Sequence, residues 1–180
     1  MWEKYLNPSN PRMVIYNGVD TEIFYPRNTV IDDEYLLFVG DSERKGLSQI
    51  QSFSPRSSLP IYIAGPSSSS ISNTKALGRL SQDKLAQYYS GALATIHPAK
   101  FEAFGNVILE SLACGTPVVA SKNCGGSELI DSSCGIVTND ISEGVSQVDQ
   151  LEKGDCKKKA KNHTWVDVAS QTEEAIGVVL

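Results

Sequence analysis

Two glutamates, Glu102 and Glu110, lie eight residues apart on either side of a glycine turn and the start of an apolar helix, in the stretch FEAFGNVILESLACGTPVVAS. The chain reverses at Gly105. Gly115 followed by Pro117 ends the helix, because glycine accepts the left-handed cap and proline cannot continue it. A helix start exposes unpaired backbone N–H groups and the positive end of the helix dipole, and both suit an anion such as phosphate. This spacing predicts the edge of a ligand crevice, with an anion site flanked by two carboxylates.

A second candidate anion site is the loop 40–46, which begins at Gly40 and contains Lys45. Backbone amides and a cation in a glycine-flanked loop after a strand often converge on one anion. Asp41 and Glu43 favour a solvated loop instead. On local physics the two interpretations have equal support.

Apolar runs and helical segments alternate along the chain, which predicts an α/β fold, a Rossmann-like three-layer sandwich with a mostly parallel sheet. We expect strands at residues 13–16, 35–39, 61–64, 76–80, 92–96, 118–120 and 135–137, and helices at residues 47–53, 81–89, 107–112, 141–152, 155–162 and 165–180. In such sheets ligands bind outside the carboxyl ends of the strands. Loop 40–46, Gly65 and residues 97–106 and 124–127 all fall at such ends.

Four residues near these elements have a structural interpretation that local physics favours. Asn17 and Gly18 form an Asn-Gly pair, which tolerates positive φ and is more often a tight turn than a backbone site beside a ligand. Tyr88 and Tyr89, on the helix that begins at Ser81, are expected to pack at the edge of the core.

The 180 residues carry a net charge of −5 and 41% of them are hydrophobic, which is typical of one ordinary globular domain. The negative charge disfavours a nucleic-acid partner, because a phosphate backbone requires a positive surface. The sequence has no run of about 18 apolar residues and no apolar signal core at its N-terminus. We therefore expect a cytoplasmic location.

The sequence predicts no metal site and lacks several catalytic motifs. His97 and His163 are the only histidines, and the cysteine spacings match neither a zinc-finger pair nor Cys-x-x-Cys. We expect reduced, structural thiols at all four cysteines, Cys114, Cys124, Cys134 and Cys156. The sequence has no Walker-type phosphate loop, no Gly-x-Gly-x-x-Gly and no Gly-x-Ser-x-Gly, which argues against ordinary kinases, dehydrogenases and serine hydrolases.

Taken together, five motifs resemble a known family. The motifs VIYNGVDTEIFYP, LLFVG…RKGL, IYIAG, FEAFGNVILESLACGTPVVAS and CGGSELI are similar, in this order, to the C-terminal half of a retaining GT-B glycosyltransferase of family 4 (glycosyl transferases group 1). The likeness extends over residues 14–137, and the two glutamates in their glycine-rich context are its specific part. It implies one nucleotide-sugar-binding domain over residues 1–180, which binds an NDP-sugar for retaining, metal-independent glycosyl transfer.

The resemblance also implies roles for the residues of the site. Glu110 would accept hydrogen bonds from both ribose hydroxyls of the donor nucleotide, since a carboxylate offers two acceptor oxygens. Glu102 would face the donor sugar rather than the phosphates, because two anions at contact distance repel each other. The amides of Phe104, Gly105 and Asn106 would hold the pyrophosphate.

Further residues take roles from the same resemblance. Lys45 would stabilise the negative charge that grows on the diphosphate as the glycosidic bond breaks, and no metal ion or other cofactor is implied. Gly40 and Gly65 would lie in the nucleotide-binding loops, with the base held largely by backbone contacts near Gly65. The family places Asn17 and Gly18 near an interdomain cleft, so a functional role for this pair has as much support as a plain turn.

The chain departs from the family pattern in two respects. An arginine usually follows the glycine after the strand predicted at 35–39; this chain has Asp41 there, and Arg44 is the candidate catalytic substitute. The family's preceding acceptor-binding domain is also missing from this sequence. The resemblance thus implies a partner domain, in cis or in trans, through which the complete enzyme could associate with the inner face of a membrane. Alone, the domain is expected to bind nucleotide sugar and to turn over little.

Two alternatives remain open. One is a noncatalytic nucleotide-sugar sensor or scaffold with the same fold, which Asp41 and the missing half slightly favour. The other is a GT-B relative that epimerises sugars, which is disfavoured because the catalytic carboxylates and histidines that it needs are not evident in the sequence.

Overall fold

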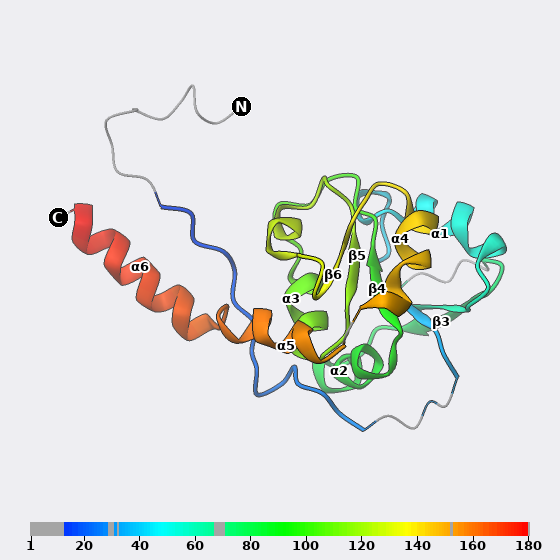
Figure 1. The fold of residues 1–180 in the computed structure, drawn as a ribbon, viewed down its shortest axis with the longest axis horizontal. Coiled ribbons are helices and arrows are strands. Elements are labelled where there is room, and N and C mark those ends of the chain that lie inside the picture. Colours follow the sequence, from blue (N-terminus) through cyan, green and yellow to red (C-terminus); the bar gives the residue numbers. More distant parts are fainter. Residues whose placement is uncertain (1–12, 29–30, 32, 67–70, 152, 180) are drawn as a thin grey trace.

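The computed structural model describes residues 13–28, 31, 33–66, 71–151 and 153–179. These residues form a six-stranded, wholly parallel sheet with the strand order β3-β2-β1-β4-β5-β6 (Figure 1). The strands are β1 Leu36–Val39, β2 Ile61–Ala64, β3 Thr74–Gly78, β4 Ala94–His97, β5 Val118–Ala120 and β6 Gly135–Val137. The predicted α/β class with a Rossmann-like parallel sheet is confirmed.

Helices cover both faces of this sheet, and most lie where the sequence predicts them. The α-helices are α1 Leu47–Phe53, α2 Gln82–Gly91, α3 Asn106–Ala113, α4 Ile141–Ser146, α5 Lys153–Lys161 and α6 Trp165–Val179, and two short 3-10 helices near the site are η2 Glu43–Lys45 and η4 Gly125–Leu129. Ser81 caps α2 as predicted, because its hydroxyl oxygen accepts a hydrogen bond from the Lys84 amide.

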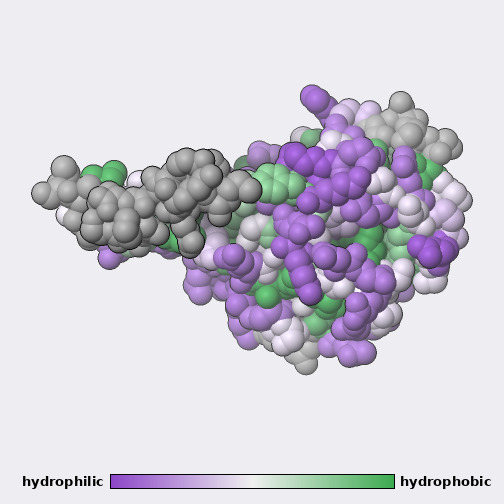
Figure 2. Space-filling model, turned by 90° about the horizontal axis from the view of Figure 1, so that it is seen from above, coloured by the Kyte–Doolittle hydropathy of each residue, from purple (hydrophilic) through white to green (hydrophobic). Residues whose placement is uncertain are grey.

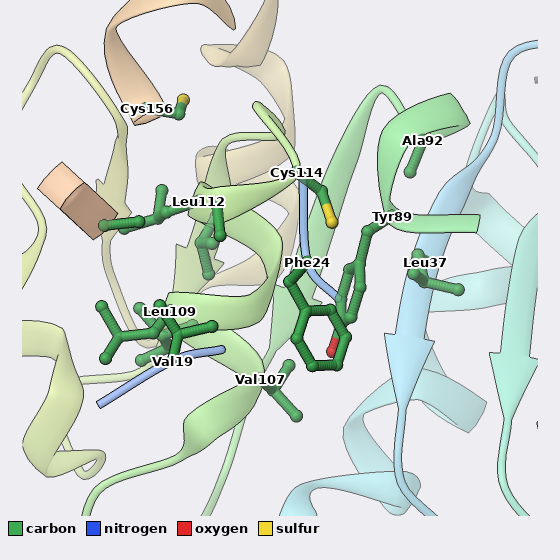
Figure 3. Packing of buried hydrophobic residues seen from close by; sticks show 14 of the residues in the cluster. Val19, Phe24, Leu37, Tyr89, Ala92, Val107, Leu109, Leu112, Cys114 and Cys156 are labelled. Carbon is green, nitrogen blue, oxygen red and sulfur yellow. The ribbon is translucent and has the colours of Figure 1, made fainter. Parts of the chain in front are cut away.

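Two hydrophobic clusters, one on each face of the sheet, join the three layers. On one face, Leu36 and Phe38 of β1 pack in a cluster with Ile50 and Phe53 of α1. On the other face, Leu37 belongs to a cluster with buried residues of α2 and α3 (Figure 3). Because both faces are covered, the central strands are continuous apolar runs rather than alternating ones.

The chain reverses its direction across the sheet between β1 and β4, since β2 and β3 lie on one side of β1 and the later strands lie on the other. Doubly wound sheets bind ligands at the carboxyl ends of the strands at such a point. The two loops that leave these strands are in contact, as the 2.9 Å hydrogen bond from the Lys100 amide to the Arg44 carbonyl shows. Residues from both loops are therefore available to one crevice.

Residues 13–16 do not form the predicted strand, and the structure places them outside the sheet. Met13 and Val14 are exposed. The segment that follows instead meets the start of α6: Val19 forms an isolated bridge with Thr164, and its amide donates a 2.8 Å hydrogen bond to the His163 carbonyl. An apolar run forms a strand only where it can pair with a neighbouring strand of a sheet. Here the residues that follow the run pair instead with residues 163 and 164, which are distant in the sequence.

The amphipathic helix predicted near the C-terminus is present as α6, but it projects away from the sheet as an arm (Figures 1 and 2). Three large apolar side chains on it are substantially exposed: Trp165 at 50%, Val166 at 74% and Ile176 at 54%. None of the apolar side chains described over residues 165–177 is thus buried within the domain.

Gly46 should be the least replaceable glycine in the loop between β1 and α1. Its φ is +95°, and a Cβ atom there would lie 2.2 Å from the Pro98 carbonyl oxygen. We expect Gly46→Ala to lower the free energy of unfolding by at least about 2 kcal/mol, from left-handed strain and overpacking together. Urea denaturation measures it.

Gly177→Ala is the matched control, because a Cβ atom on Gly177, which lies in α6, would meet no other atom within 4 Å. This substitution should instead stabilise the helix by up to about 1 kcal/mol. If the two substitutions change the free energy of unfolding equally, the Gly46 backbone does not pack against the Pro98 carbonyl as closely as described.

Candidate functional site

A cleft of about 510 Å³ opens at the carboxyl ends of β1 and β4. It is lined by Asn17, Val39, Arg44, Lys45, Leu85, His97, Glu102, Ala103, Phe104, Gly105, Asn106, Val107 and Glu110. Thus every residue predicted for the site lines the cleft, except Gly18, Gly40 and Gly65. Two other hollows among the described residues, of about 420 and 320 Å³, contain none of them.

Gly40 and Gly65 lie behind the cleft and are needed for close packing there. A Cβ atom on Gly65 would lie 2.6 Å from the Gly40 carbonyl oxygen, and one on Gly40 would lie 2.9 Å from Cδ of Lys45. Side chains at these two positions would therefore displace the loop that carries Lys45. The two glycines position the cleft rather than line it.

The Asn17-Gly18 pair is divided between two environments. The Asn17 side chain lines the cleft and donates a 2.8 Å hydrogen bond from Nδ2 to Oδ1 of Asn106. Gly18 has no positive φ and residues 17 and 18 form no turn, so of the two interpretations left open for this pair the tight turn does not apply. A Cβ atom on Gly18 would lie 2.5 Å from the Trp165 amide nitrogen. This glycine is required by the close approach of the α6 backbone.

The start of α3 is fixed by contacts that leave no room for a side chain. Gly105 is the N-cap, with a φ of +84° and no side-chain capping bond. A Cβ atom there would lie 2.8 Å from Sγ of Cys124, and the Gly126 amide donates a 2.7 Å hydrogen bond to the Phe104 carbonyl. Since the first amides of a helix have no acceptor within it, this end of α3 presents donors to the cleft.

Arg44 and Glu102 form an ion pair inside the cleft. Nη1 of Arg44 lies 2.9 Å from Oε2 of Glu102, with the arginine side chain 52% exposed and the glutamate 14% exposed. The Glu102 backbone is held by η4, because its carbonyl accepts a 3.0 Å hydrogen bond from the Gly125 amide. The predicted substitute cation and one of the predicted carboxylates are therefore in direct contact.

Glu110 lies one turn into α3 and is half-buried. Burial raises the pKa of its carboxyl group above the usual value, although the hydrogen bond from Tyr89 and the positive charge of Lys45 act in the opposite direction. The Tyr89 hydroxyl donates to Oε2 of Glu110 over 2.8 Å. The prediction of Tyr89 as core-edge packing was incomplete, because its ring is fully buried while its hydroxyl reaches a residue of the cleft.

His97 is a cleft residue that the predicted site did not include. It ends β4 with 0% exposure, and neither ring nitrogen has a hydrogen-bond partner among the described residues. Burial lowers the pKa of His97 to about 4, so the ring is neutral near pH 7. Its place at the carboxyl end of a buried strand, just before Glu102, is the sequence signal that could have identified it.

The sequence itself matches a known family. Residues 69–164 match the family described as Glycosyl transferases group 1. The chain belongs to this family. Together with solved GT-B neighbours, the match confirms the C-terminal domain of a GT-B glycosyltransferase that the sequence motifs predicted.

Curated relatives are also glycosyltransferases by name. An uncharacterized glycosyltransferase of Methanocaldococcus jannaschii is 27% identical over 183 residues, which cover 88% of this chain and 51% of that protein. A D-inositol 3-phosphate glycosyltransferase of Acidothermus cellulolyticus is 32% identical over 145 residues, covering 61% of this chain and 32% of that protein. The chain spans about half the length of the first of these relatives, and less of the second.

Solved structures share the fold at low sequence identity. A sucrose-phosphate synthase from Thermosynechococcus elongatus aligns with a TM-score of 0.79 and 20% identity, over 99% of this chain and 55% of that one. The Anabaena protein HepE, solved in complex with UDP and glucose, aligns with a TM-score of 0.74 and 18% identity, over 92% of this chain and 57% of that one. Both matches again involve a little over half of the larger protein.

Two further features of the described residues bear on the sequence predictions. No group of three or more His, Cys, Asp and Glu side chains there could hold a metal ion. None of the helices there combines the length and the apolar character that crossing a membrane requires.

Because the pKa of His97 is lowered, the folded domain should lose stability in acid. The unfolded state binds a proton near pH 6.5 and the folded state only near pH 4, so stability contributed by neutral His97 is present above pH 6.5 and lost as the pH falls toward 4. Between pH 7 and pH 4.5 this loss should be about 2 kcal/mol. Urea denaturation at both pH values measures this loss, which should be about 2 kcal/mol smaller in His97→Asn than in the wild type. A pH dependence equal to that of the wild type would contradict the buried, neutral ring.

Proposed function

We propose that the domain binds a nucleoside-diphosphate sugar in this cleft and forms the donor half of a retaining glycosyltransferase. One observation carries the proposal: the start of α3, the half-buried carboxylate of Glu110 and two cations, Arg44 and Lys45, all line one cleft. Its volume of about 510 Å³ lies within the range of about 300–1,000 Å³ typical of small-ligand sites.

In the proposed complex each part of the donor has a chemically matched partner. The diphosphate lies at the start of α3, where unpaired amides and the helix dipole favour an anion. The ribose diol donates hydrogen bonds to Glu110, four residues further along the same helix. Glu102, on the other side of Gly105, accepts hydrogen bonds from the donor sugar. The order of these residues along one loop and helix matches the order of the groups in a nucleotide sugar.

Lys45 and Arg44 are the proposed catalytic cations, acting without a metal ion. As the bond between sugar and diphosphate breaks, negative charge grows on the leaving diphosphate, and a fixed cation lowers the energy of that state. Lys45 would act on the diphosphate directly. Arg44 takes the place of the arginine that Asp41 replaces, and its ion pair with Glu102 offsets a carboxylate charge that would otherwise repel the donor.

The acceptor side of the reaction requires a further domain, in cis or in trans. The chain spans only 51% of its relative from M. jannaschii and 55% of the sucrose-phosphate synthase from T. elongatus, which supports this proposal. The complex of HepE with UDP and glucose supports nucleotide-sugar binding by this type of domain, although the sequence identity is 18%.

A noncatalytic nucleotide-sugar sensor is the second candidate function. The observation that favours it is the Arg44–Glu102 ion pair, which joins the proposed replacement arginine to a carboxylate of the protein itself. Supplying a family acceptor-binding domain in trans distinguishes the two: glycosyl transfer supports the enzyme, whereas tight nucleotide-sugar binding without transfer supports the sensor.

Calorimetry with UDP, GDP, ADP and their sugars tests the proposal. At least one should bind, and Glu110→Gln should weaken its affinity by about 10- to 150-fold, the cost of one hydrogen bond to a charged acceptor. Glu173→Gln, which changes an exposed carboxylate on α6, is the control and should bind like the wild type. Failure of every nucleotide to bind at millimolar concentration would reject the proposed function, and unchanged affinity in folded Glu110→Gln would reject the ribose contact.

A further inference from the structure

The contact between Tyr89 and Glu110 joins two helices at the inner wall of the cleft. Tyr89 lies on α2 and Glu110 lies 21 residues later on α3, and the tyrosine hydroxyl is 2.8 Å from Oε2 of the glutamate. The tyrosine ring has 0% exposure, and burial raises the pKa of its hydroxyl well above the usual value. The hydroxyl is therefore a permanent hydrogen-bond donor to the carboxylate.

Tyr89 is itself held firmly in place. The hydroxyl of Thr116 donates to its backbone carbonyl, which fixes the end of α2 beside the end of α3. The ring of Phe24 packs edge-on against the tyrosine ring, with centroids 6.1 Å apart and planes at 68° (Figure 3). A buried ring that is held at its backbone and packed against a second ring is costly to move in a close-packed core. Its hydroxyl position is set by the fold and does not depend on a ligand.

This contact constrains how Glu110 can receive a ligand. A carboxylate has two oxygens with about four acceptor sites in all, and Tyr89 occupies one site on Oε2. A buried carboxylate with no donor would pay a large desolvation cost and would be free to rotate about its side-chain bonds. With Tyr89 in place, the remaining acceptor sites keep one orientation, which suits a rigid pair of vicinal hydroxyls.

We propose that Tyr89 is a positioning residue that makes Glu110 selective for ribose over 2′-deoxyribose in the bound nucleotide. The inference rests on the proposed function, because it takes the ribose of a nucleoside diphosphate as the group that Glu110 contacts. Tyr89 touches no ligand itself. It acts by fixing the carboxylate so that both hydroxyls of the diol can donate hydrogen bonds to it at the same time.

The test compares ribo- and 2′-deoxyribonucleoside diphosphates of the base that binds best among UDP, GDP and ADP. In the wild type, the ribonucleotide should bind about 10- to 150-fold more tightly, since the missing hydroxyl leaves a charged acceptor without a donor. Tyr89→Phe should weaken ribonucleotide binding and change deoxyribonucleotide binding little, so the ratio falls to within a few-fold of one. Tyr88→Phe, which removes the hydroxyl of the neighbouring residue, is the matched control and should keep the wild-type ratio.

A pH profile of affinity provides a second measurement that a merely structural tyrosine would not shift. The groups that shift the pKa of the Glu110 carboxyl among the described residues are Tyr89 on α2 and Lys45 in η2, and the carboxyl in turn raises the pKa of Cys114 at the end of α3. Loss of the Tyr89 hydrogen bond removes a contribution that lowers the Glu110 pKa. Protonation of the carboxyl, and with it the loss of affinity on acidification, should therefore begin at higher pH in Tyr89→Phe. Protonation of the nucleotide itself is common to both proteins.

Each outcome decides a separate question. If the wild type binds ribo- and deoxyribonucleotides with equal affinity, the inference is overturned, although nucleotide binding stands. A folded Tyr89→Phe variant that keeps the wild-type ratio of the two affinities would also overturn the inference. A wild type that binds no nucleotide rejects the proposed function itself.

If Tyr89→Phe does not fold, 3-fluorotyrosine at position 89 keeps the ring and hydroxyl in place. Its stronger donor should move the acid limb to lower pH, and an unchanged limb would overturn the inference.

Discussion

The close packing of residues 102–105 against residues 123–126 is the constraint on which the rest of the cleft depends. The two segments form an isolated bridge between Glu102 and Cys124, and a Cβ atom on Gly125 would lie 2.1 Å from the Ala103 carbonyl oxygen. Backbone thus lies directly on backbone, with no space for side chains between them. The start of α3, and with it the direction of its unpaired amides, is fixed before any ligand arrives.

The second wall of the cleft comes from the point where the strand order reverses. The loop after β1 carries Arg44 and Lys45, and its contact with the loop after β4 holds both cations near the start of α3. The glycines behind this loop permit that approach. In the proposed function, an anion site on one element and cations from another converge because parallel strands end at the same edge of the sheet.

Local spacing was enough to predict much of the site. Glu102, Gly105 and Glu110 lie on one turn and one helix, so their mutual arrangement follows from residues close in sequence. The contacts that these residues make with other parts of the chain do not follow from local sequence. The donor to Glu110 is 21 residues away on another helix, and nothing in the pattern around Tyr89 indicates that its buried side chain directs a hydroxyl to Glu110.

The failed predictions share a physical cause. The run at 13–16 was predicted as a strand, and a tight turn was one of the two interpretations of Asn17-Gly18. This segment instead meets residues 163–165, which only the folded chain brings near. The orphaned ring nitrogens of His97 are likewise visible only once its neighbours are known. The parallel sheet and the edge of the site could be predicted from periodicity and spacing, whereas long-range contacts could not.

A two-dimensional amide NMR titration of the domain with UDP, GDP and ADP tests the anion site at the start of α3 most directly. We expect saturable shifts at the amides of residues 104–107 and in the loop that carries Lys45, with little change at residues 139–142, which line a separate hollow. Shifts confined to that hollow, or no saturable shift with any of the three nucleotides, would contradict an anion site at the start of α3.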